Sequence, residues 1–442
     1  MRQRSTSWLV AVPVILVATV ALIWYLFASM PEPVIRQRFL VLEGGWRNLL
    51  GAFVSGVIGI GLAAWAWGKA VRPGRAVSYA VTAGTHLLLL GVVGAVFYPV
   101  VYLLAVSFNR NNTLATALPT EGNIFVRSGV WPDPQRISTI QYERVLSETH
   151  LDLIHWLLLG LLTLLLIAVI SVHLAGRAAA ITASQRDTWI RWLGFGLFTA
   201  AAALVISITP ANFYSINSAG ERGTASSERA IVLYIRNTLL VSGTTGLFAV
   251  LISASAGYAF ARLRFEGRYQ TLLTFVFVQM FPGFMALVAI YWLMVRLDLL
   301  NTFSGLILAY SGGAIAFASW IFKGYVESLS PALEEAALVD GATRWGAFWR
   351  VILPLSVPML LFIFLMQFIG TYSEFILANT LLQGQENWTV GMGLRNFTTG
   401  RFDTQWGALA ASAVLGSLPI LVIFYSFQDA LTGEHAAGGV KG

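Results

Sequence analysis

Long apolar stretches recur through this chain and determine most of what it can fold into. A helix needs about 20 apolar residues to cross a bilayer, because the hydrocarbon core offers no water to satisfy the backbone. About ten segments meet that requirement. They are Trp8–Phe27, Asn48–Trp67, His86–Phe108, Leu151–Leu174, Trp192–Ile208, Ile231–Phe260, Gln270–Val295, Ser304–Phe322, Val357–Leu377 and Gly407–Phe427. The sequence therefore predicts an all-α polytopic transmembrane helical bundle.

The composition excludes several other classes of protein. Hydrophobic residues make up 57% of the 442 residues and charged residues only 11%, which is too few charges for an ordinary soluble protein. The net charge of +7 is spread over short loops, so it indicates membrane orientation and not nucleic-acid binding. With no Cys and five scattered His, we expect no disulfide framework and no metal site.

The basic residues predict an orientation. The first apolar run is too long for a signal peptide and lacks a clear cleavage site, so we expect a retained anchor. A cytoplasmic N-terminus, and with an even number of spans a cytoplasmic C-terminus, satisfies the positive-inside rule. It places inside the basic groups Lys69/Arg72/Arg75, Arg177/Arg186, Arg262/Arg264/Arg268 and Lys323/Arg344/Arg350. Arg36, Arg38 and Arg47 in the first outer loop oppose this orientation.

Ionisable residues inside the spans are few. Arg236 and Glu374 lie near the outer ends of their spans, where pairing or snorkelling explains them. The absence of a carboxylate chain across the midplane disfavours an ion-coupled transporter. The three lysines, Lys69, Lys323 and Lys441, lack a phosphate-binding P-loop context. If ATP drives this protein, a separate subunit must bind it.

The polar segment 330–354 predicts two short helices between the eighth and ninth spans. Ser330 suits an N-cap, Pro331 suits the first helical position, and Gly341 can adopt the positive φ that ends a helix. Pro354 is expected to limit the second helix. From the residues alone, this segment could be an amphipathic interfacial stretch or a compact projection that fits another protein.

The residues of this segment resemble a known motif. Glu335-Ala336-Ala337, then Gly341, then Val351-Ile352-Leu353-Pro354, resemble the EAA loop of binding-protein-dependent ABC importer permeases, with Val351 where the family usually has Ile. The resemblance implies a type I importer permease whose loop is a coupling helix that docks in a cytoplasmic ATPase. The residues it assigns to docking are Glu334, Glu335, Ala336, Ala337, Asp340, Gly341, Leu353 and Pro354.

Other segments resemble MalG-type maltose/maltodextrin permease subunits over about 78–112 and 229–442. The matching segments are Thr85–Leu90, Ala256–Phe265, Phe322–Tyr325, Glu334–Thr343, Leu353–Pro358 and Ala437–Gly442. The resemblance implies a core of six spans that begins with the third, and four extra helices. The expected divisions are 1–77 (two additional helices), 78–112 (first core span), 113–228 (outer loop and inserted helix pair) and 229–442 (core domain).

Two further segments of the core domain carry predicted contacts. The outer loop 383–406 resembles the scoop loop that enters the sugar-binding protein, although such a loop is usually a plain connector. Its predicted contact residues are Gly391, Gly393, Asn396, Phe397, Phe402 and Trp406. The tail 429–442 has the composition of a disordered end but resembles the family tail that inserts between the ATPase subunits. Its predicted contact residues are Gly438, Gly439, Val440, Lys441 and Gly442.

The function implied is that of a permease subunit, not an enzyme, in an ATP-driven importer of maltose/maltodextrin-type sugars. The expected partners are a companion MalF-type permease, a cytoplasmic ATPase dimer that binds ATP and Mg²⁺, an extracytoplasmic sugar-binding protein and membrane lipid. The chain itself is expected to bind no cofactor and no nucleic acid, and to reside in the cytoplasmic (inner) membrane. The alternatives are a permease for another carbohydrate or a sugar phosphate, an ion-coupled secondary transporter, or a membrane enzyme.

Overall fold

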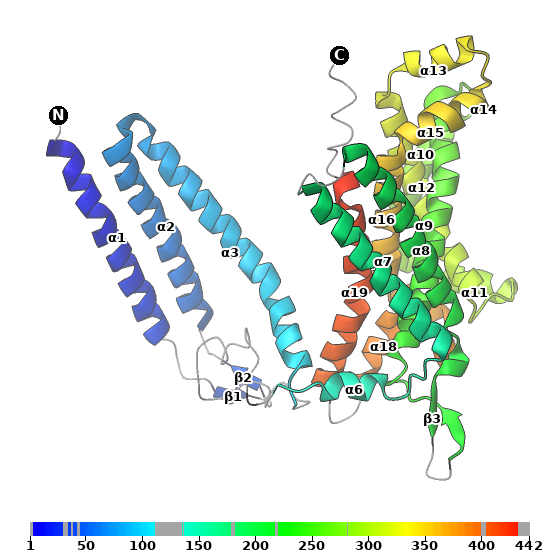
Figure 1. Ribbon diagram of the computed structural model, residues 1–442, viewed down its shortest axis with the longest axis horizontal. Coiled ribbons are helices and arrows are strands. Elements are labelled where there is room, and N and C mark those ends of the chain that lie inside the picture. The colour runs from blue at the N-terminus through cyan, green and yellow to red at the C-terminus, as the bar shows by residue number, and fades with distance from the viewer. Residues whose placement is uncertain are drawn as a thin grey trace. The chain divides into compact units, whose positions relative to one another are not determined.

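The computed structural model describes residues 3–29, 34–36, 39–41, 45–110, 135, 137–177, 182–216, 220–280, 282–398 and 404–431. Helices dominate these residues (Figure 1). The chain divides into two compact units, one formed by 1–141 with 405–411 and the other by 142–404 with 412–442. Each unit is described by itself.

Unit 1 contains the first three long helices. They are α1 (Gln3–Ala28), α2 (Gly45–Val71) and α3 (Ala76–Ser107), with the antiparallel strands β1 (Val34–Arg36) and β2 (Phe39–Val41) and the 3-10 turn η1 (Pro73–Arg75) between them. Small residues let α1 and α2 approach closely, since a side chain at Gly59 would overlap Thr19. The Asn48 side chain also donates a 2.8 Å hydrogen bond to the Leu26 carbonyl.

The chain continues from α3 into the elements of the second unit. These are α6 (Ile140–Leu146), α7 (Leu153–Arg177), α8 (Ala183–Ser207), η2 (Pro210–Asn212), β3 (Tyr214–Ile216), β4 (Arg222–Thr224), α9 (Ile231–Arg262), α10 (Arg268–Met280) and α11 (Gly283–Arg296). Then follow α12 (Phe303–Ser328), α13 (Pro331–Val339), α14 (Arg344–Ala347), η3 (Phe348–Ile352), α15 (Leu353–Leu355), α16 (Val357–Ser373), α17 (Ile376–Leu381), η4 (Gln385–Asn387), α18 (Val390–Asn396) and α19 (Trp406–Leu431).

The predicted membrane-spanning bundle is confirmed. In the described part of the chain, eight helices are long and apolar enough to cross a membrane, or up to ten if two bent helix pairs each count as one span. The predicted span Gln270–Val295 corresponds to one of these pairs, which bends by 106°. Pro282 lies at this break, where it cannot donate a backbone hydrogen bond. The predicted span Val357–Leu377 ends early, at Ser373.

Helix α9 packs against both α12 and α16. The ring of Phe322 and the backbone of α12 lie against Gly257, where a Cβ atom would be 2.9 Å from the Lys323 nitrogen. A Cβ atom at Gly246 would likewise lie 3.0 Å from the ring of Phe364 in α16. Glycine therefore lets three helices approach closely enough to form a continuous core. One core cluster consists of Ala254, Tyr258, Ala318, Phe322, Val326, Phe348, Ile352 and Ile363.

Helices α7 and α8 and the segments beside them contact this core through polar groups. The Arg236 guanidinium of α9 donates to the Val205 carbonyl of α8 at 3.2 Å. Outside the helices, the buried Glu148 carboxylate accepts from Arg229 at 2.8 Å and from the Ser226 amide at 2.6 Å. The Asn212 side chain joins the two chain segments that flank α7 and α8 by donating to the His150 carbonyl at 3.2 Å. Arg236 thus makes polar contacts near the end of its span, where the sequence left pairing and snorkelling open.

Candidate functional site

The 330–354 loop lies at one end of the bundle formed by α9, α12 and α16, and α18 and β3 lie at the opposite end (Figure 1). Its first helix, α13, begins as the sequence predicts, with Ser330 at the N-cap and Pro331 at the first helical position. The Ser330 side chain makes no capping hydrogen bond. Its carbonyl instead accepts from the Leu333 amide at 3.2 Å.

Gly341 ends α13 in the predicted left-handed conformation, with φ of +86°. The Ala342 amide donates to the Ala337 carbonyl at 3.0 Å and the Gly341 amide donates to the Leu338 carbonyl at 3.1 Å. These two bonds form a Schellman motif, which favours glycine at this position. No atom outside its immediate neighbours lies within 4 Å of a Cβ built at Gly341, so the space beside it is open.

The second helix ends close to Pro354, as predicted, and the chain then bends by 73° into α16. The helical path continues from Arg344 to Leu355 and passes through a π-helical turn at Phe348–Ile352. A π turn shifts the hydrogen-bond pattern by one residue, and this path accommodates the missing N–H of Pro354. The Ser356 amide closes the helix by donating to the Ile352 carbonyl at 3.0 Å.

Glu334 fixes the loop to α9. Its side chain is only 7% exposed, and one carboxylate oxygen accepts a 2.6 Å hydrogen bond from the Tyr258 hydroxyl. The other oxygen lies 3.3 Å from Nε of Arg262, whose terminal nitrogen also donates to the Leu329 carbonyl at 2.8 Å. A buried carboxylate needs such partners to offset its lost hydration. Glu334 therefore holds α13 in position and does not face outward.

Two apolar residues of the second helix insert into the core. Phe348 is 2% exposed and its ring lies 4.8 Å from that of Tyr258, while Ile352 is fully buried. Trp345 stacks on the other side of Phe348 with a centroid separation of 5.4 Å. Tyr258 thus contacts both helices of the loop, and the loop is packed as part of the bundle.

The outward surface of the loop combines apolar and acidic residues. Val339 is 88% exposed, and the acidic residues Glu335 and Asp340 lie on the same short helix with their side chains in solvent. Other exposed apolar side chains are Leu333, Trp345 and Trp349. Ala336 and Gly341 are exposed, Ala337 and Leu353 are half-buried, and Pro354 is exposed. Of the predicted docking set, Glu334 alone is buried.

The outer loop is held at the other end of α9. The fully buried Asn237 side chain donates to the carbonyls of Glu386 at 2.8 Å and Trp388 at 3.0 Å. The neighbouring Thr238 hydroxyl accepts from the Val390 amide at 2.9 Å. Helix α9 therefore positions both loops. Its last turns hold the 330–354 loop, and its first turns hold the outer loop.

The structure separates the predicted contact residues of this outer loop. Gly393 and Phe397 are buried, and a side chain at Gly393 would overlap the Tyr234 ring. Asn396 donates a hydrogen bond to the Ser227 hydroxyl. Gly391 and Trp406 are half-buried. Phe402 and the tail residues Gly438–Gly442 lie outside the described residues.

The chain resembles known proteins at the level of family and fold. The model of the binding-protein-dependent transport system inner membrane component matches residues 249–433. The maltose/maltodextrin transport system permease protein MalG of Vibrio vulnificus (strain YJ016) is 37% identical over 303 residues, which cover 66% of this chain and 95% of that protein. MalG of Escherichia coli (strain K12) is 36% identical with the same coverage. The chain belongs to this permease family.

A solved structure supports the same fold for the permease. A bacterial ABC transporter involved in the import of the acidic polysaccharide alginate matches 80% of this chain and 97% of its own, with a TM-score of 0.52 and 17% sequence identity. The permease is thus a multi-pass inner-membrane subunit of a binding-protein-dependent ABC importer, and a transporter rather than an enzyme. Within the described residues, no group of three or more His, Asp or Glu is placed to hold a metal ion.

Sequence reasoning missed the residues that position the permease's two loops. Tyr258 and Arg262 lie in the segment that resembles the family, but their shared partner Glu334 is distant in sequence. Asn301 was also missed. It adopts a positive φ of 57°, and its side-chain oxygen accepts from the Gly384 amide at 2.8 Å. A polar residue in an otherwise apolar run, such as Asn237, is the signal that could have identified such anchors.

Proposed function

We propose that this permease transports maltose/maltodextrin-type sugars that an extracytoplasmic binding protein delivers. The observation that carries the proposal is the 37% identity to a maltose/maltodextrin permease over 95% of that protein's length. The translocation pathway would be shared with a companion MalF-type permease. A cytoplasmic ATPase dimer would bind ATP and Mg²⁺ and drive the change between inward-facing and outward-facing states through its differential affinity for them.

We place ATPase docking on the exposed face of the 330–354 loop. Val339, Trp345 and Trp349 expose apolar area, and Glu335 and Asp340 add acidic groups, which together suit a partially apolar socket with basic residues at its rim. Glu334 would act as a positioning residue, because its carboxylate is held inside the chain. The tail 429–442 is proposed as a second ATPase contact.

The orientation and core of the permease follow from the same assignment. A cytoplasmic docking loop places the C-terminal ends of α9 and α12 in the cytoplasm, in agreement with the positive-inside orientation. Both termini would then be cytoplasmic and the 383–406 loop would face the binding protein. The six core spans would be α3, α9, the α10–α11 pair, α12, α16 and α19, with α1, α2, α7 and α8 as additions.

Reconstitution of the complex tests this function. The tagged permease is purified with its copurifying proteins and incorporated into liposomes, and ATP hydrolysis is measured with the binding protein and either maltodextrin, another oligosaccharide or a sugar phosphate. We expect a second permease, an ATPase and hydrolysis stimulated by maltodextrin. Stimulation only by a different sugar would overturn the assignment of the substrate. Recovery of the permease without any ATPase would overturn the assignment of the docking surface.

A further inference from the structure

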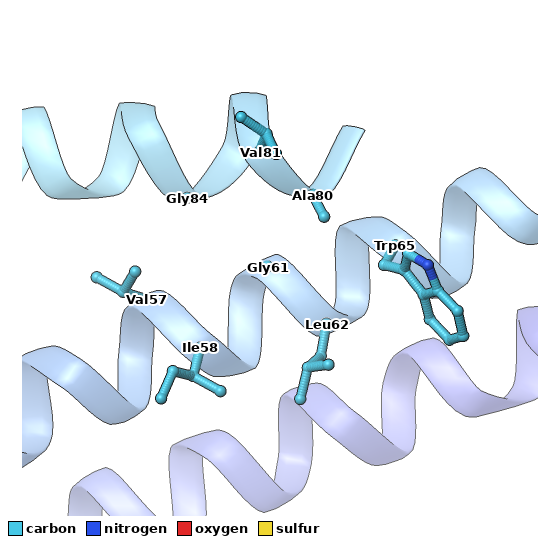
Figure 2. A pocket seen from close by; sticks show the side chains of 8 residues that line it. All are labelled: Val57, Ile58, Gly61, Leu62, Trp65, Ala80, Val81 and Gly84. Carbon is cyan, nitrogen blue, oxygen red and sulfur yellow. The ribbon is translucent and has the colours of Figure 1, made fainter. Parts of the chain in front are cut away.

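A groove runs between α2 and α3 in unit 1. It has a volume of about 480 Å³ and is lined only by apolar or small residues (Figure 2). Its lining includes Val57, Gly61, Leu62 and Trp65 of α2 and Ala80 and Gly84 of α3. Both helices are long and apolar enough to span a membrane, so in a bilayer the groove would lie at the depth of the hydrocarbon region.

Small residues produce the groove. The two helices touch near the turn that joins them, where a Cβ at Gly68 would lie 2.7 Å from the Ala76 Cα. Figure 2 shows Ala80 on the side of α3 that faces Gly61. A Cβ at Gly61 would still be 3.9 Å from the Ala80 carbonyl, and none of the surrounding atoms lies within 4 Å of a Cβ at Gly84. The missing side chains leave a slot about 12 Å long between Val57 and Trp65, at 1.5 Å per helical residue.

Three cations lie at one end of this slot. Lys69 follows Trp65 by one helical turn and its Nζ lies 5.4 Å from the Trp65 ring centroid. Arg72 and Arg75 are exposed in the turn that follows. The sequence from Gly45 to Ser107 contains no Asp or Glu, and none of the three cations forms an ion pair with any residue that the structure describes. Their charge therefore has no acidic counterpart in the part of the chain that the structure describes.

We propose that this groove binds an anionic phospholipid. One acyl chain would occupy the slot beside Gly61 and Gly84, and the phosphate would lie at the turn near Lys69, Arg72 and Arg75. An apolar slot next to cations that lack an acidic partner among the described residues complements both parts of such a lipid. The positive-inside rule places this end in the cytoplasmic leaflet. The indole of Trp65 lies between the two parts, at the depth where aromatic residues favour the interface.

Both halves of the lipid are required by this geometry. Free phosphate would satisfy the cations but leave the apolar slot to other lipids, whereas a zwitterionic lipid would fill the slot but leave the cations without a net countercharge. The site is also independent of the transported sugar, because neither the loop 330–354 nor the outer loop 383–406 contributes a residue to it.

Lipid retention by the full-length permease tests the site. The protein is equilibrated in mixed micelles that contain equal amounts of phosphatidylglycerol and phosphatidylcholine with identical acyl chains, and the retained lipids are counted by native mass spectrometry. We expect the wild type to retain phosphatidylglycerol preferentially. Replacement of Lys69, Arg72 and Arg75 by Gln should lower that preference by roughly fivefold for each cation removed.

Two glycine variants separate the groove from the surface charge. Gly84→Leu should fill the slot and reduce retention of phosphatidylglycerol at least several-fold, with the three cations intact. Gly94→Leu is the matched control, since Gly94 lies on the same helix with open space beside it but does not line the groove. Wild-type retention in Gly84→Leu, or in the charge variant, would overturn the proposal. Equal retention of phosphatidylcholine and phosphatidylglycerol by the wild type would also overturn it, because the cations would then contribute nothing to the choice of lipid.

Discussion

The Tyr258 hydroxyl donates a 2.6 Å hydrogen bond to the buried Glu334 carboxylate and joins the last turns of α9 to the first turn of α13. Arg262 supplies a positive charge on the other side of the same carboxylate, at 3.3 Å. This anchor lies beneath the exposed face that we assign to ATPase docking. A displacement of α13 by a partner subunit would therefore be transmitted to α9 through this charged contact as well as through side-chain packing.

Tyr258→Phe should lower stability and weaken coupling. The change leaves a buried carboxylate oxygen without its donor, which costs about 1 to 3 kcal/mol. We expect lower thermal stability of the purified complex and less sugar transported per ATP hydrolysed in liposomes. Tyr325→Phe is the control, because it removes one hydrogen bond to the Leu355 carbonyl at the same end of the bundle. Equal effects of the two variants would contradict a specific role for the anchor.

Gly341→Asp should abolish transport while the complex still reaches the membrane. A side chain at a φ of +86° strains the Schellman turn by about 1 kcal/mol and would project into the partner's surface. Gly267→Asp provides the same change at a φ of +83° with open space around it, outside the proposed docking surface. Transport assays in vesicles distinguish the two sites. Normal transport by Gly341→Asp would remove the support for docking there.

Asn237→Ala should loosen the outer loop. Its side chain is fully buried and holds two carbonyls of that loop, so the loss leaves both acceptors without a donor at a cost of about 1 to 3 kcal/mol. We expect faster proteolysis within residues 383–405 and weaker stimulation of ATP hydrolysis by the binding protein. Asn379→Ala, at an exposed position that accepts from Arg395, should have little effect. Unchanged proteolysis of the Asn237 variant would contradict the anchoring role.

Two glycines of α9 should respond to alanine with opposite signs. A methyl group at Gly257 would lie 2.9 Å from the backbone nitrogen of Lys323 and push α12 away. Gly257→Ala should therefore destabilise the protein by about 1 to 3 kcal/mol. Gly243 has open space, so Gly243→Ala should stabilise the helix by about 0.5 to 1 kcal/mol. Thermal unfolding of the purified permease measures both. Destabilisation by both variants would contradict the explanation that the loss of stability in Gly257→Ala comes from the close spacing of α9 and α12.

Apolar length predicted the spans well because it reports directly on the solvent that each helix occupies. The 106° bend beside Pro282 was not predicted, whereas the helix end next to Pro354 was, since the effect of a proline depends on whether the neighbouring turn can shift its hydrogen bonds. The turn at Gly341 was predicted correctly, because a positive φ after a helix is a local property of glycine.

Contacts between distant segments could not be predicted in this way. Glu334 and Glu335 are identical neighbours in the sequence, yet Glu334 is buried against Tyr258 and Glu335 is exposed. Which of the two faces inward depends on the helical phase of α13 relative to α9, and this phase is set by the insertion of Phe348 and Ile352 into the core. The burial of Gly393 and Phe397 likewise depends on how α18 packs against α9.

Helix α9 is 32 residues long, or about 48 Å at 1.5 Å per residue, and it holds a loop at each end. If both loops bind partners, and each partner prefers one of two positions of this helix, their binding free energies are linked through this one element. The sugar-loaded binding protein would then strengthen ATPase binding by some factor. Thermodynamic reciprocity requires that the ATPase strengthens binding of the sugar-loaded binding protein by the same factor. Arg236 places the contact with α8 on the same helix, so lipid conditions that displace α7 and α8 would change that common factor without touching either partner.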